Sequence, residues 1–163
     1  MNSPATSSSR ISRNPWKIRY FLDTEFTDFD VRQLISIAIV GEDRREFYAE
    51  CSDFDRVHCS DFVRATVLPQ LGHPPGRSMP FLQLRDELRA WLRACPSKPK
   101  PILCYDFEGD LELIQRLLDG TLPSGWKTEN ITLKIDAVRL ADYAAAHGGT
   151  HLLRCINSAT HVC

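Results

Sequence analysis

Three stretches near the start of the chain decide the fold: residues 18–26 (IRYFLDTEF), 34–40 (LISIAIV) and 46–50 (EFYAE). Each is rich in apolar, β-branched or aromatic residues, as strands are, and polar turns at residues 28–32 and 41–44 separate them. The middle stretch is almost continuously apolar, which is typical of a strand buried on both faces. Three strands joined by short turns predict an antiparallel meander.

Helices and strands alternate after the meander. The apolar spacing and the turn residues predict helices near 60–71, 84–95, 110–118 and 137–146, and strands at 102–105 and 131–135. This order predicts an α/β fold with one five-stranded mixed sheet, an antiparallel three-strand meander plus parallel strands, and helices on both faces. We expect residues 1–16 to form a flexible tail and residues 17–163 to form a single domain.

The composition of the chain excludes several classes of protein. The chain has 163 residues, 43% hydrophobic and 25% charged, with a net charge of −1, so it does not bind nucleic acid through overall basic charge. No apolar run reaches the roughly 20 residues that span a bilayer, and no apolar leader is visible, so we expect a cytoplasmic protein that does not enter membranes. The six cysteines form no C-x-x-C pair, which favours free buried thiols.

Two carboxylates interrupt the first apolar stretch. Asp23 and Glu25 are two residues apart, so a strand places both on one face. Buried carboxylates are costly unless they are paired or bind a cation, and their oxygens are ligands that Mg²⁺ or Mn²⁺ prefers. The alternative interpretation is that the end of the strand has simply reached solvent.

A second acidic segment, residues 104–110 (CYDFEGD), joins a short strand to a helix. If that strand lies beside the first, Asp110 or Asp106 can complete a cluster of three carboxylates. Asp110 also suits the N-cap of the helix, and Asp106 also suits a turn whose side chain binds its own backbone.

Residues 19–29 (RYFLDTEFTDF) and 34–50 (LISIAIVGEDRREFYAE) resemble the beginning of DEDD-type 3′–5′ exonucleases, in particular the bacterial and mycobacterial 3′–5′ exoribonucleases related to ribonuclease T and oligoribonuclease. The resemblance implies a ribonuclease-H-like fold. It also implies that Asp23 and Glu25 form the first motif of the family. Asp110, in the stretch GDLELIQRLL, matches the second.

The third motif of that family is a His followed after four residues by an Asp, and here the chain departs from it. Asn157 stands where the Asp is expected, and His151 lies six residues ahead of it. By the resemblance His151 is the general base and Asn157 a metal ligand. His147 and His161 are alternatives to His151.

The resemblance thus implies a two-metal hydrolase that uses Mg²⁺ or Mn²⁺ bound by Asp23, Glu25, Asp110 and Asn157, with His151 as base. Its substrate would be single-stranded RNA, or DNA ends, shortened from the 3′ end to nucleoside 5′-monophosphates, with Phe26 and Thr27 contacting the substrate and Phe29 beside the last base. Relatives of this kind often form homodimers, so the resemblance makes a homodimer one expectation for this chain. The alternative is a weakened or inactive member that binds nucleic-acid ends or a protein partner.

Overall fold

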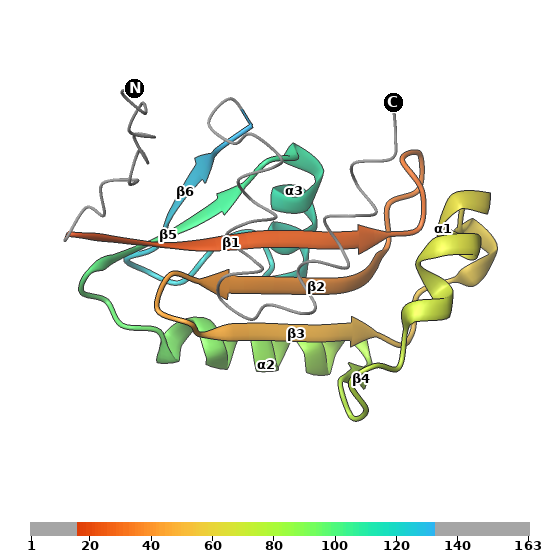
Figure 1. Ribbon diagram of the computed structural model, residues 1–163, viewed down its shortest axis with the longest axis horizontal. Coiled ribbons are helices and arrows are strands. Elements are labelled where there is room, and N and C mark those ends of the chain that lie inside the picture. The colour runs from red at the N-terminus through yellow and green to blue at the C-terminus, as the bar shows by residue number, and fades with distance from the viewer. Residues whose placement is uncertain (1–15, 133–163) are drawn as a thin grey trace, which may run out of the picture.

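The computed structural model describes residues 16–132, which form a six-stranded sheet in the order β4-β3-β2-β1-β5-β6 (Figure 1). β1 pairs antiparallel with β2, and β2 with β3, whereas the pairs β1–β5, β3–β4 and β5–β6 are parallel. The strands are β1 (Lys17–Phe26), β2 (Leu34–Gly41), β3 (Glu46–Cys51), β4 (Ser78–Met79), β5 (Lys100–Tyr105) and β6 (Lys127–Asn130). The mixed α/β sheet, its meander and its ribonuclease-H-like character are as predicted.

The strand count differs from the prediction, with six strands in place of five. β4 has two residues and pairs only with the end of β3. β6 occupies residues 127–130, ahead of the predicted strand at 131–135. That prediction is wrong in its placement: residues 131 and 132 follow β6, and 133–135 lie outside the described residues. β6 (KTEN) is a mostly exposed edge strand, so it needs no apolar alternation that a sequence pattern could reveal.

The helices of the described residues are α1 (Asp61–Thr66), α2 (Phe81–Ala94) and α3 (Glu108–Leu117), with short 3₁₀ turns η1 (Arg56–His58) and η2 (Leu68–Gln70). Ser60 caps α1, since its hydroxyl accepts a hydrogen bond from the amide of Val63. α3 begins before Asp110. Phe107, in extended conformation, is its N-cap residue, so the N-cap interpretation of Asp110 is wrong.

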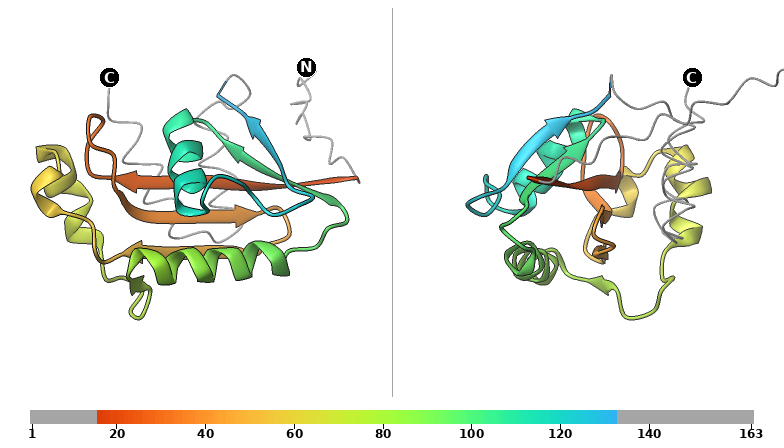
Figure 2. Two further views of the ribbon diagram at one scale, coloured as in Figure 1. Left: turned by 180° about the vertical axis from the view of Figure 1, so that it is seen from behind. Right: turned by 60° about the vertical axis from the view of Figure 1, so that its left-hand side comes forward.

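Both longer helices cover the same face of the sheet. Figure 2 shows α2 and α3 on one side, and their apolar residues join one core cluster with alternate residues of the strands. Leu84, Leu88 and Leu92 of α2 are almost completely buried there. α1 packs against Ile35 in a separate, smaller cluster.

Several expectations fall outside or at the limit of the described residues. The predicted helix at 137–146 and all of the predicted tail except Trp16 are among them. Four cysteines lie within the described residues, and all four are buried free thiols, as expected. Within residues 16–132, no helix is both long and apolar enough to cross a membrane.

Candidate functional site

The acidic pair of β1 lies on one face of the sheet, as its spacing predicts. Asp23 is opposite Ala38 of β2 and Glu25 is opposite Ser36, while Thr24 points to the face that α2 and α3 cover. Ser36 and Ala38 are buried, and so is the Oδ2 atom of Asp23. The carboxylates therefore lie in a sheltered place, not at a strand end that has reached solvent.

Asp110 reaches the carboxyl end of β1 from the first turn of α3, on the helix-covered face to which Thr24 points. Its side chain is 3% exposed, and its Oδ1 atom accepts a hydrogen bond of 2.5 Å from the hydroxyl of Thr24. The helix follows β5, which is parallel to β1 and next to it, so the chain direction brings the start of α3 to the carboxyl end of β1. Thr24 thus couples the first acidic segment to the second.

Glu25 and Asp110 repel each other across this junction. Burial, and then repulsion from Asp110, raise the pKa of Glu25 to about 7. Burial raises the pKa of Asp110 to about 7, aided by repulsion from Asp106 and opposed by the hydrogen bond from Thr24. Two buried carboxyls with raised pKa values are an arrangement that a bound cation would relieve.

These residues suit a hard divalent cation but do not form a finished site by themselves. Among residues 16–132, no three His, Cys, Asp or Glu side chains lie close enough together to hold a metal ion. Asp23 and Glu25 share a face, and Glu25 and Asp110 interact; these are the parts of the predicted carboxylate cluster that the structure brings together. The predicted His151 and Asn157 lie outside the described residues, as do His147 and His161.

Asp106, the other candidate for a third carboxylate, is an exposed turn residue. Its main-chain oxygen accepts a hydrogen bond of 2.5 Å from the hydroxyl of Thr132. Asp110, which is buried and contacts Thr24, is therefore the better candidate of the two.

An aromatic cluster adjoins the acidic residues. Phe26 is the last residue of β1, next to Glu25, and Phe107 immediately precedes α3. Their rings stack with centroids 5.9 Å apart. Phe29 meets both rings edge to face, at 5.2 and 6.1 Å, and is 63% exposed. An exposed set of rings of this kind offers stacking surface to a planar ligand.

The sequence indicated Phe26 and Phe29 but not their partners. Phe107 and Arg32 were missed, and the guanidinium carbon of Arg32 lies 5.9 Å from the ring centre of Phe26 and 5.6 Å from that of Phe107. Only the position of Phe107 directly before the acidic helix could have indicated it. Nothing in the pattern around Arg32 marks it as a neighbour of both rings.

Thr27 has a local role in the structure. Its side chain is fully buried, and its hydroxyl donates to the carbonyl of Val31 at 2.5 Å and accepts from the amide of Gln33 at 3.1 Å. These bonds hold the turn that carries Phe29. The buried hydroxyl cannot itself reach a ligand without rearrangement of this turn.

Comparison with known proteins gives a partial match. Over 80 residues the chain is 44% identical to a 3′–5′ exoribonuclease of Mycobacterium tuberculosis, present in strains CDC 1551 / Oshkosh and ATCC 25618 / H37Rv. The match covers 47% of this chain and 46% of each relative, so it extends over less than half the length of the curated relatives. No protein-family model matches the chain. The chain is thus similar, over part of its length, to proteins named as 3′–5′ exoribonucleases.

Proposed function

We propose that the protein is a metal-dependent 3′–5′ exoribonuclease that hydrolyses single-stranded RNA from its 3′ end to nucleoside 5′-monophosphates. The observation that carries this proposal is that half-buried Glu25 interacts with buried Asp110, which Thr24 of the same strand binds where β1 meets α3. The similarity to mycobacterial 3′–5′ exoribonucleases supports the choice of reaction.

Asp23, Glu25 and Asp110 would hold Mg²⁺ or Mn²⁺, because carboxylate oxygens are the ligands these ions prefer. Bound there, the metal would supply Lewis-acid activation and neutralise the negative charge of a phosphodiester. Asn157 would be a fourth ligand and His151 would accept the proton of the attacking water, both on the basis of the resemblance. Thr24 would orient Asp110 through its hydrogen bond.

The aromatic cluster would form the part of the site that binds the substrate. Phe26, Phe29 and Phe107 would stack on the terminal bases, which is a contact that favours single strands over duplexes. Arg32, beside two of these rings, would hold them in place. Thr27 would contribute by fixing the turn that carries Phe29.

The test is cleavage of a 5′-labelled single-stranded RNA with Mg²⁺, with Mn²⁺ or with EDTA. We expect a ladder that shortens from the 3′ end and that EDTA abolishes. Asp23→Ala and Asp110→Asn should remove activity, whereas Asp86→Asn, at an exposed position of α2, should retain it. A single-stranded DNA of the same sequence, run in parallel, measures the preference for RNA.

Metal binding has a readout that does not require cleavage. Mg²⁺ should raise the melting temperature of the wild-type protein and of Asp86→Asn more than that of Asp110→Asn. Cleavage that continues in EDTA, or an equal Mg²⁺ effect in all three proteins, would contradict the assignment.

Asn157 favours a second candidate function, a weakened member that binds RNA ends and cleaves slowly, because an amide is a neutral ligand. Restoring the carboxylate with Asn157→Asp should then raise the cleavage rate. No gain from this change, together with a wild-type rate that saturates with Mg²⁺, would favour the fully active enzyme.

A further inference from the structure

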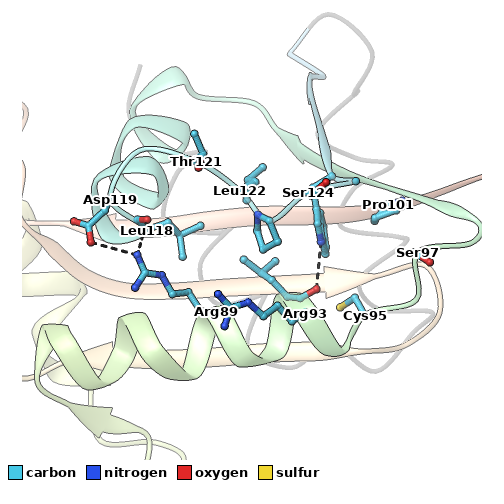
Figure 3. A pocket seen from close by; sticks show the side chains of 14 residues that line it. Arg89, Arg93, Cys95, Ser97, Pro101, Leu118, Asp119, Thr121, Leu122 and Ser124 are labelled. Carbon is cyan, nitrogen blue, oxygen red and sulfur yellow. Dashed lines mark hydrogen bonds and ion pairs between the residues drawn. The ribbon is translucent and has the colours of Figure 1, made fainter.

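A hollow of about 790 Å³ lies on the helix-covered side of the sheet, between the C-terminal half of α2 and the loop at residues 118–126 (Figure 3). Its volume is within the usual range of about 300–1,000 Å³ for small-molecule sites. The loop follows the C-terminal end of α3, whereas Asp110 is in its first turn, so roughly 12 Å of helix separates this pocket from the acidic pair. The pocket therefore takes no part in the site described above.

A row of arginines on α2 leads into the pocket. Arg85, Arg89 and Arg93 are four residues apart, which places them on one side of the helix. Arg85 and Arg89 donate to the last main-chain carbonyls of α3, at 2.7 and 2.9 Å, and both pair with Asp119, at 2.7 and 3.2 Å. These two guanidinium groups thus hold the end of α3 in place.

Arg93 continues the row but contributes nothing to that contact. It is exposed, lines the pocket, and makes no hydrogen bond or ion pair with any residue from 16 to 132. The only acidic side chain among the lining residues is Asp119, which the other two arginines already neutralise. Within residues 16–132, the pocket therefore carries a positive charge that has no ionic partner.

The pocket also has an aromatic wall. The indole N–H of Trp126 donates to the carbonyl of Leu92 at 3.2 Å, and its ring lies 4.9 Å from the ring of Tyr20, so the side chain is fixed and its polar atom is satisfied. Leu122 and Pro101 add apolar surface. Three hydroxyl side chains complete the lining: Ser97, Thr121 and Ser124.

We propose that this pocket binds a nucleoside phosphate, with the phosphate at Arg93 and the base against the wall formed by Trp126. A guanidinium donates to phosphate in a bidentate manner, an aromatic wall accepts a planar base, and hydroxyls suit a ribose. The same chemistry is presented by a free mononucleotide and by a nucleotide within a single strand. Binding here requires neither metal nor hydrolysis, so the proposal stands apart from the proposed nuclease activity.

The three tryptophans of the chain allow a direct test. The full chain is labelled with ¹⁵N, and its indole N–H signals are recorded by NMR in a buffer that contains EDTA. The signal of Trp126 is assigned by its loss in Trp126→Phe. It is then followed during titration with adenosine 5′-monophosphate, with a five-nucleotide RNA, or with ribose 5-phosphate. We expect the signal to move and saturate with the mononucleotide, the RNA or both. Ribose 5-phosphate should bind more weakly because it lacks the base.

Two variants and a control decide the outcome. Arg93→Gln should weaken binding about tenfold, as expected for the loss of one charge-assisted hydrogen bond, and Ser124→Phe should weaken it by filling the pocket. Arg56→Gln removes an exposed arginine in η1, near the opposite end of α2, and should change nothing. The proposal is overturned if the Trp126 signal does not move, if Arg93→Gln binds like wild type, or if ribose 5-phosphate binds as well as the nucleotide.

Discussion

Replacing Asp110 by Asn should stabilise the metal-free protein while removing its proposed activity. Asp110 is 3% exposed, and its pKa is raised from 3.8 to about 7, a difference that corresponds to about 4 kcal/mol between the folded and unfolded states. The amide keeps an oxygen that can accept the hydrogen bond of Thr24 but carries no charge. Because a buried site relaxes in part, we expect a gain of about 1–3 kcal/mol in the free energy of unfolding.

The gain should depend on pH with a definite sign. The fold binds the proton of Asp110 more tightly than the unfolded chain does, so the cost of the charge is absent below pH 3.8 and complete above about pH 7. Melting in EDTA at pH 8 should show an increase of roughly 3–10 °C for Asp110→Asn. Near pH 4 the two proteins should melt at nearly the same temperature.

Asp86→Asn provides the matched control, since it makes the same change of side chain at an exposed position of α2. Loss of this exposed charge should change stability by less than about 1 kcal/mol. The reasoning is refuted if Asp110→Asn melts at or below the wild-type temperature at pH 8, or if its gain is the same at pH 4 and pH 8.

Three further predictions concern stability. Thr24→Val should raise the pKa of Asp110 further and cost about 1–3 kcal/mol, because a buried bond to a carboxyl is lost; urea unfolding measures this, and Thr24→Ser should recover part of the loss. Leu88→Ala should cost about 2–5 kcal/mol in the same assay, since Leu88 is fully buried in the main core, whereas Leu82→Ala, 64% exposed on the same helix, should change little. Gly109→Ala should lower the free energy of unfolding by about 1–3 kcal/mol, because a β-carbon there would overlap the ring of Phe107. Near-ultraviolet circular dichroism should report the displacement of that ring.

The sequence was sufficient for those features that depend on local periodicity. Alternation along β1 predicts that Asp23 and Glu25 share a face, and the helical spacing of Leu84, Leu88 and Leu92 predicts the buried stripe of α2. Both patterns arise because one side of the element must be buried.

Features that depend on contacts between distant segments could not be predicted in this way. β6 is polar and is a strand only because its backbone pairs with β5. The bond between Thr24 and Asp110 joins residues 86 positions apart, and a threonine in a strand gives no sign of such a partner. The packing of Trp126 on Tyr20 likewise joins distant segments and appears only once the sheet has formed.

The alternation of Asp23, Thr24 and Glu25 also protects the fold against a specific error. If β1 slipped by one residue against β2, two carboxylates would turn into the apolar layer beneath α2 and Thr24 would turn away from Asp110. Such an intermediate would bury two charges without partners and would be strongly disfavoured. The acidic residues therefore favour the native register of β1 against β2 during folding, whatever ion or substrate they later bind.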